Sequence, residues 1–208
     1  MDKLQNTEEK ILEAAKEVFH QKGLHGSRMQ EIADRAGINK ALLHYYFRSK
    51  EALFEKVFYD TFSQLASKMF EIFSSEMTLI SKIEIFVSFY LNFISKHSFV
   101  IYFVMNALHD RPEQLRDIIL KQNFSPDLIL EQIGKQLKEE FGIELDPLQI
   151  YVNIMSLVIF PVIARPLIQS ITGITDENMA GFYEQRKKLV PTFILNALKG
   201  YATQKNNI

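Results

Sequence analysis

The sequence predicts an all-α protein, and three observations favour that fold class. Apolar residues recur at helical spacing along most of the chain, as in Phe54, Phe58, Leu65 and Met69. Residues that cap or break helices separate these segments. No segment shows the alternation of apolar and polar residues that is typical of a half-buried strand. The chain of 208 residues, 47% of them hydrophobic, is long enough to bury a sizeable core.

The first predicted helix begins at Asn6 or Thr7. Its apolar face contains Ile11 and Val18, two helical turns apart, with Ala14 and Ala15 between them. Gly23 is expected to end this helix, because glycine readily takes the left-handed backbone conformation that follows a helix.

The next stretch predicts a short helix whose apolar face begins at Met29 and continues through Ile32, Ala33 and Ala36. Ser27 stands three residues before Gln30, the spacing of a capping box, and Ser27 is therefore expected to cap this helix.

A second short helix is predicted directly after a turn at Gly37. Asn39 is expected to cap it. Ile38 and Leu43 stand on either side of that cap at the spacing of a hydrophobic staple. Two short helices joined by a tight glycine turn form a helix-turn-helix, whose second helix can lie in the major groove of DNA.

The charges of this stretch favour a nucleic-acid partner. Four basic residues and no acidic residue lie between Arg35 and Lys50. Leu43 and Phe47 are expected to be buried, and Ser49 is expected to cap the following helix, which places Lys50 at a helix N-terminus suited to phosphate. The residues predicted to contact base edges or phosphates are Ser27, Arg28, Gln30, Lys40, Ala41, His44, Tyr45, Tyr46 and Lys50.

A long helix is predicted from Lys50 to Phe73. Further helices are expected from a capping box at Ser81 and Glu84 to Lys96, over 99–108, from 110–112 to Asn123, and from 125–127 to a stop at Gly142. Asp146-Pro147 and Thr175-Asp176 are expected to begin two last long helices, with Pro161, Pro166 and Pro191 as kinks.

The last two helices carry more apolar residues than one buried face needs. A dimer is therefore expected to form through them, as a four-helix interface around a two-fold axis. The residues that support this expectation are Ile150, Ile154, Val158, Val162, Ile163, Phe182, Leu189, Val190, Phe193, Ile194 and Leu198.

Composition excludes several classes of chemistry. The net charge is −1, so DNA binding must depend on local placement of charge. The chain has no cysteine, its five histidines show no i, i+4 ligand pair, and no phosphate-binding or hydrolase motif is present. We expect no enzyme, metal or cofactor. The polar N-terminus and the two prolines in the uncharged run 147–164 favour a cytoplasmic location without a membrane span.

The segments ILEAAKEVF, FHQKG and EIADRAGINKALLHYYFRSKEAL resemble the N-terminal domain of tetracycline-repressor (TetR) family transcription regulators. The resemblance covers roughly the first 55 residues. It implies a helix-turn-helix domain over 1–50, a helical ligand-binding and dimerisation domain over 51–208, and repression relieved by a small, mainly apolar effector. The pocket that it implies in the second domain is expected to be lined by Phe89, Phe93, Tyr102, Phe103, Met105 and Asn106.

Two alternatives stay open. His97, His109 and Arg165 are alternative anchors for an acidic effector, although helix-end histidines and a solvated arginine explain them better. The second alternative is a helical ligand-binding or scaffold protein that has lost DNA binding. It is supported by Leu42, where the family commonly has a small hydroxyl residue, and by His44, where tyrosine is common.

Overall fold

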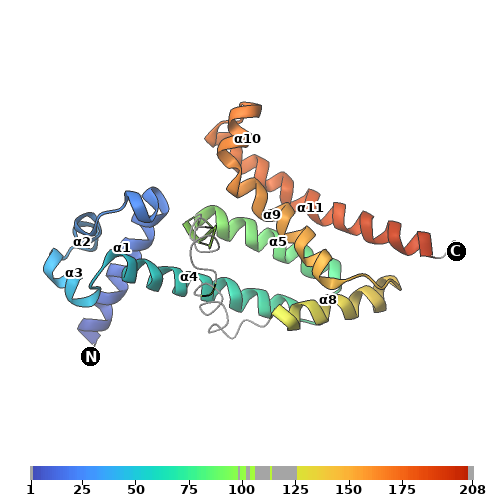
Figure 1. Ribbon diagram of the computed structural model, residues 1–208, viewed down its shortest axis with the longest axis horizontal. Helices are drawn as coiled ribbons and strands as arrows, with labels where there is room; N and C mark the ends of the chain where they lie inside the picture. Colours follow the sequence, from blue (N-terminus) through green and yellow to red (C-terminus); the bar gives the residue numbers. More distant parts are fainter. Residues whose placement is uncertain (1, 98, 102–103, 106–112, 114–125, 206–208) are drawn as a thin grey trace. The chain divides into compact units, whose positions relative to one another are not determined.

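The structure, a computed structural model, describes residues 2–97, 99–101, 104–105, 113 and 126–205, which form helices joined by short turns (Figure 1). No strand occurs among them, so the predicted all-α class is confirmed. The chain divides into two compact units. The first, here the head unit, contains Met1–Gln64 and Lys96–Ile118; the second, the body unit, contains Leu65–Ser95 and Ile119–Ile208.

The helices of the head unit are α1 (Asp2–Gly26), α2 (Met29–Ala36), α3 (Lys40–Tyr46) and the first part of α4 (Lys50–Phe73). The helices of the body unit are the rest of α4, α5 (Leu79–Lys96), α8 (Pro126–Phe141), α9 (Pro147–Ile163), α10 (Arg165–Thr172) and α11 (Asp176–Lys205). The two units share α4, which has the predicted bounds. The domain boundary after residue 50 stays a prediction. The helix expected between 110–112 and Asn123 lies outside the described residues.

Two glycines place the helices of the head unit. Gly23 has φ 64° and interrupts α1 where the sequence predicts its end. Gly37 has φ 68°, and its N–H donates to the Asp34 carbonyl, while the N–H of Ile38 donates to the Ala33 carbonyl. These bonds satisfy the free carbonyls at the end of α2. A side chain at either glycine would occupy a backbone conformation that non-glycine residues rarely adopt.

The predicted capping box at Ser27 is wrong. Helix α2 begins at Met29, the residue before it is Arg28, and no side chain caps the helix. Ser27 is buried, and its hydroxyl donates to the carbonyl of Leu24 instead, at 2.8 Å. The hydroxyl therefore stabilises the turn before α2 rather than the first turn of α2.

The core of the head unit joins α1 to α4 through aromatic rings. The rings of Phe19 and Phe54 meet edge to face with centroids 4.7 Å apart. Phe99, from the segment that follows α5 in the chain, lies against Phe54 at 6.0 Å, and the ring of His97 meets that of Phe99 at 6.2 Å. Residues 97 and 99 thus extend the core of the head unit beyond its first four helices.

His97 gives the head unit a pH dependence. Burial lowers the pKa of its imidazole below the usual 6.5, and the positive charges of His20, Lys16 and Lys96 lower it further, partly opposed by Glu13. The neutral form is therefore favoured in the folded state. The stability that depends on it is present in full above pH 6.5 and is lost as the pH falls toward the lowered pKa.

We expect the thermal midpoint of the head unit to fall as the pH is lowered from about 7 to about 5, and a His97→Gln variant to show a flatter profile. Circular dichroism melts at closely spaced pH values measure this. His25→Gln, at an exposed histidine at the end of α1, serves as the control. A wild-type profile that His97→Gln leaves unchanged would assign the pH dependence to other groups.

A buried lysine and a glutamate link three helices of the body unit. Lys82 of α5 is almost fully buried, and its ammonium donates to the carbonyl of Phe73 at the end of α4, at 2.9 Å. Burial lowers the pKa of Lys82, and the charges of Glu140 and Glu76 oppose that shift. The carboxylate of Glu140, on α8, accepts the N–H of Leu79 at the start of α5, at 3.0 Å. The capping box predicted at Ser81 is misplaced, because α5 begins at Leu79, two residues earlier.

Prolines act differently in the three helices that end the chain. Pro161 lies inside α9 and has no N–H for the carbonyl of Leu157, four residues earlier. The guanidinium of Arg186 from α11 donates to that carbonyl at 2.6 Å instead. Pro191 lies inside α11. Pro166 does not kink a long helix: it is the second residue of a separate helix, α10, bent by 67° from α9.

The apolar residues that α9 and α11 expose differ in part from those that the sequence suggested for a dimer interface. Ile150, Ile154 and Val158 of α9 are buried within the body unit, as are Val190, Ile194 and Leu198 of α11. These residues form core, so they are not available to a partner as the sequence suggested. The large apolar side chains that α9 and α11 do expose, here called the apolar strip, are Leu148, Val152, Phe160, Leu189, Phe193 and Tyr201.

Candidate DNA-binding surface

Helix α3 is held to the head unit by a single buried side chain. Leu43 is fully buried and is the one residue of α3 in the core. The side chain of Asn39 caps the helix by accepting the N–H of Leu42 at 2.8 Å, as predicted. Phe47, expected to be buried, is half-buried just past the end of the helix. The opposite side of α3 is therefore open to solvent.

The predicted DNA-contacting residues differ in exposure. Four of the five predicted residues on α3 are exposed, and Tyr45 is 77% exposed. Tyr46 is half-buried, and its ring lies edge to face against Tyr45, at 5.6 Å between centroids. Exposed residues of the set are Arg28, Gln30, Lys40, Ala41, His44 and Tyr45; Tyr46 and Lys50 are half-buried, and Ser27 is buried.

Lys50 and Ser27 are joined in a way the sequence did not predict. The ammonium of Lys50 donates to the backbone carbonyl of Ser27 at 3.1 Å. Ser49 caps α4 as predicted, because its hydroxyl accepts the N–H of Ala52 at 3.0 Å. The lysine is thus fixed at the start of α4, beside the turn that precedes α2. An ammonium has three donors, so one bond to a carbonyl leaves capacity for a phosphate oxygen.

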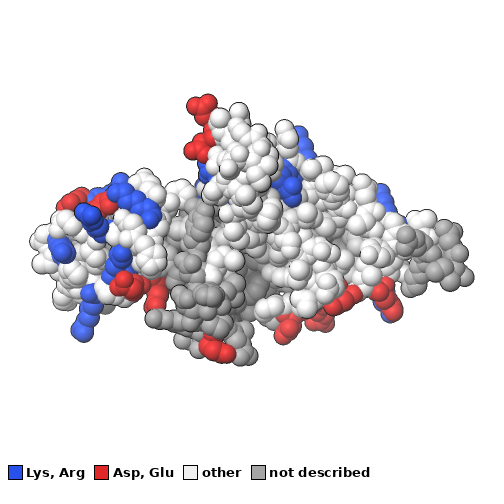
Figure 2. Space-filling model, turned by 45° about the horizontal axis from the view of Figure 1, so that its top comes forward, with Lys and Arg blue, Asp and Glu red and all other residues white. Residues whose placement is uncertain are grey.

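Ion pairs neutralise acidic residues close to this surface. Glu31 of α2 pairs with Lys22 of α1 at 2.7 Å, and Glu17 of α1 pairs with Arg35 at 3.1 Å. The carboxylate of Asp34 accepts a hydrogen bond from Gln30 at 2.7 Å. Exposed pairs of this kind add little stability. They do reduce the repulsion that free carboxylates would exert on DNA, and lysine and arginine side chains gather on this unit at the left of Figure 2.

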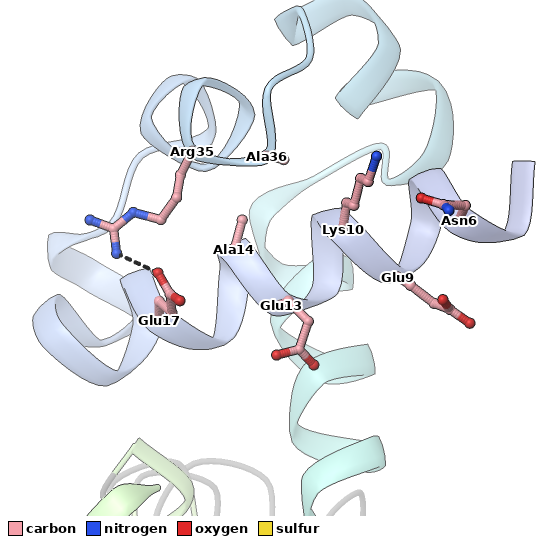
Figure 3. A pocket seen from close by; sticks show the side chains of 8 residues that line it. All are labelled: Asn6, Glu9, Lys10, Glu13, Ala14, Glu17, Arg35 and Ala36. Carbon is pink, nitrogen blue, oxygen red and sulfur yellow. Dashed lines mark hydrogen bonds and ion pairs between the residues drawn. The ribbon is translucent and has the colours of Figure 1, made fainter. Parts of the chain in front are cut away.

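An open pocket of about 450 Å³ lies elsewhere on the head unit, between α1 and the end of α2 (Figure 3). Glu9, Glu13 and Glu17 line it along α1, and Arg35 and Ala36 face them from α2. None of the nine predicted DNA-contacting residues lines it. Its open shape and the charged side chains that line it are unlike the apolar cavity expected for the effector.

The residues predicted to line an effector pocket are only partly described. Phe93 is buried, Phe89 is half-buried with its ring 5.6 Å from that of Phe93, and Met105 is exposed. Tyr102, Phe103 and Asn106 lie outside the described residues. Of the alternative anchors, His97 belongs to the head unit and Arg165 pairs with Asp176 at 2.7 Å, while His109 is not described.

Two tyrosines of the body unit, one buried and one half-buried, were not singled out from the sequence as polar anchors. Tyr90 is buried and Tyr151 is half-buried. Burial raises the pKa of both phenols, and for Tyr90 the charge of Tyr151 raises it further. Both hydroxyls therefore stay protonated and can donate a hydrogen bond. Tyrosines at helical spacing carry no mark in the sequence that separates such groups from ordinary core residues.

Comparison with known proteins shows which protein family the helix-turn-helix segment resembles. The sequence profile described as "Bacterial regulatory proteins, tetR family" matches residues 11–57, which contain the helix-turn-helix. The HTH-type transcriptional regulator RutR of Escherichia coli is 54% identical over 44 residues, which are 21% of this chain and 21% of RutR. The match thus spans about a fifth of that relative's length.

Solved structures share the whole fold at low sequence identity. A transcriptional regulator of the TetR/AcrR family from Thermobifida fusca has a TM-score of 0.59 and 18% identity, over 88% of this chain and 96% of its own. Transcriptional regulator FadR from Bacillus subtilis, solved with stearoyl-CoA, has a TM-score of 0.56 and 19% identity, over 87% and 96%. The helix-turn-helix and the matched profile together show that residues 11–57 are a helix-turn-helix domain of the tetR family of bacterial regulatory proteins.

Proposed function

We propose that this protein is a DNA-binding transcription regulator, and a repressor rather than an activator. The observation that carries the proposal is the exposed side of α3. Lys40, Ala41, His44 and Tyr45 face solvent there, while Leu43 anchors the helix from behind. Lysine, histidine and tyrosine supply donors for base edges and phosphates, and the alanine methyl suits a thymine methyl. The protein acts in the cytoplasm, where DNA is accessible.

The regulator acts as a homodimer through the apolar strip on α9 and α11. A two-fold axis brings the strip of one copy against that of the other and buries both. Two heads then read half-sites of a palindromic operator that lie one helical turn of DNA apart, or a multiple of it. Among the described residues, no single helix is long and apolar enough to cross a membrane. The bent pair of α9 and α10 meets that test by length and composition only.

The effector binds within the body unit and is small and mainly apolar. Phe89 and Phe93 supply apolar surface, and the stearoyl chain in the solved structure of FadR supports an effector of this class. Repression is relieved if the effector binds more tightly to a conformation whose heads no longer match the half-site spacing. Helix α4 supports this mechanism, because one continuous helix belongs to both units.

Two lysine variants test the DNA-binding surface. We expect Lys50→Ala to weaken binding to all duplexes similarly and to lower the salt slope by about 1, because a phosphate contact carries no sequence information. Lys40→Ala is expected to relax the preference at one base position, at a cost of about 1–3 kcal/mol. Selection of random duplexes by the purified protein, followed by titration at several salt concentrations, measures both effects.

Lys68→Ala is the matched control. Lys68 lies on the part of α4 that belongs to the body unit and pairs with Glu71, so its removal is expected to change neither affinity nor salt slope. If the Lys40 and Lys50 variants behave like this control, α3 and the start of α4 are not the surface that meets DNA.

A further inference from the structure

Helix α10 exposes an apolar face that no other described part of the chain covers. None of its residues is buried, and Leu167 and Ile171 are 56% and 74% exposed. Helices shorter than about 12–15 residues are marginal by themselves in water. A helix of eight residues with no buried side chain therefore gains little from the packing that stabilises most helices of this length. Figure 1 shows α10 at the end of the α9–α11 pair where α9 ends and α11 begins.

Specific hydrogen bonds hold that apolar face outward. Arg165 and Gln169 both donate to the carboxylate of Asp176 at the start of α11, at 2.7 and 2.6 Å. These hydrogen bonds lower the pKa of Asp176, and the bond from Gln169 has the larger effect, followed by that from Arg165. The carboxylate is therefore ionised near neutral pH. Two residues along a helix turn by roughly 200°. Leu167 and Ile171 therefore lie on the side of α10 opposite to the bonded residues.

The exposed face of α10 is suited to an apolar, uncharged partner surface. Arg165 is the one charged residue of the helix, and Asp176 neutralises it. The hydroxyl of Thr172 donates to the carbonyl of Ile168 at 2.7 Å. Neither nucleic acid nor a charged peptide would find a complementary charge on this face.

The distribution of exposed apolar side chains indicates what covers this face. Of the fifteen large apolar side chains exposed in the described parts of the chain, eight lie on α9, α10 and α11. A stable interface takes about 20–30 residues from each side. The six large apolar side chains of the apolar strip are a minority of that number, so a neighbouring element that adds exposed apolar surface would enlarge the interface. Helix α10 joins α9 to α11 in the chain and supplies that element.

We propose that α10 is a clasp that packs its Leu167 and Ile171 side chains against the α9–α11 pair of a second copy of this chain. The proposal rests on the dimer proposed above. In a two-fold arrangement each copy contributes one clasp and receives one, so the area buried is gained twice. The bonds to Asp176 orient the helix before the partner arrives, which lowers the ordering cost of association.

Cross-linking from α10 tests the proposal directly. The chain has no cysteine, so Ile171→Cys can be labelled with benzophenone maleimide at that position alone. A mixture of ¹⁴N- and ¹⁵N-labelled copies is irradiated, and cross-linked peptides are identified by mass spectrometry. We expect peptides of mixed isotope that join α10 of one copy to α9 or α11 of the other. Leu128→Cys, an exposed position of α8, is the matched control and is expected to give none.

A second variant measures the strength of the contact. Leu167→Ser with Ile171→Ser is expected to raise the dimer dissociation constant by at least about tenfold in sedimentation equilibrium. The far-UV spectrum should stay that of the wild type, because no side chain buried within the chain is removed. A dimer with unchanged dissociation constant and no cross-links from position 171 would overturn the clasp and leave the proposed dimer standing.

Two other outcomes identify different partners for the same face. A wild-type protein that is monomeric at every concentration would overturn the proposed dimer itself, and the clasp with it. Binding of the wild type, but not of the double serine variant, to vesicles of equal parts phosphatidylcholine and phosphatidylglycerol, with no cross-links between copies, would overturn the clasp in favour of a lipid surface.

Discussion

Phe193→Arg is expected to convert the dimer to monomers and to lower affinity for the selected duplex by about 100-fold or more, because two linked heads bind far more tightly than one. Phe193 is 56% exposed on α11, within the apolar strip. In a two-fold interface the substitution buries two arginines, one from each copy. The apolar strip contains no acidic residue that could pair with them. Sedimentation velocity and duplex titration measure the two losses.

The folded state of each copy should survive this change. Phe193 is exposed within its own chain, and substitutions at exposed positions usually change the free energy of unfolding by less than about 0.5 kcal/mol. Leu128→Arg introduces the same charge at an exposed apolar position of α8 outside the strip, and it is expected to leave the dimer intact. Dimers that tolerate Phe193→Arg but not Leu128→Arg would move the interface to α8.

Leu43→Ala is expected to lower the free energy of unfolding of the head unit by about 3 kcal/mol. Leu43 is the only buried side chain of α3, and its truncation leaves a cavity in the core. Stabilities of whole domains are about 5–15 kcal/mol, so this is a large fraction. Urea titration followed by circular dichroism measures the loss, and amide hydrogen exchange over 29–46 locates it. Affinity should fall for all duplexes alike, because the head unit is folded, with α3 in place, in a smaller fraction of the molecules.

Leu42→Ala is the adjacent control. Leu42 is 37% exposed, so its truncation is expected to change the unfolding free energy by less than about 0.5 kcal/mol. The same variant addresses the departure from the family pattern at this position. If removing the leucine changed the preferred base at one position of the duplex, Leu42 would contact a thymine methyl. Equal losses of stability at Leu42 and Leu43 would mean that the buried side of α3 is misassigned.

The local structure of the head could be predicted from the sequence, because short-range chemistry decides it. The left-handed turn at Gly37, the cap at Asn39 and the start of α4 after Ser49 each depend on residues within four positions of one another. Helical spacing likewise identified Leu43 as the anchor of α3. The capping box at Ser27 failed because Arg28, not Ser27, directly precedes α2, and the Ser27 hydroxyl donates to the carbonyl of Leu24 instead of accepting an N–H of α2.

The sequence by itself determined that this is an all-α protein with a helix-turn-helix near its N-terminus, because helical spacing, caps and glycine turns are local signals. Only the tertiary structure decided which apolar residues of α9 and α11 are core and which are exposed. It also showed that Arg186 satisfies the carbonyl left free by Pro161, and that α10 holds Ile171 toward solvent. These features depend on helices far apart in the chain meeting in space, and the residues of one helix do not carry that information.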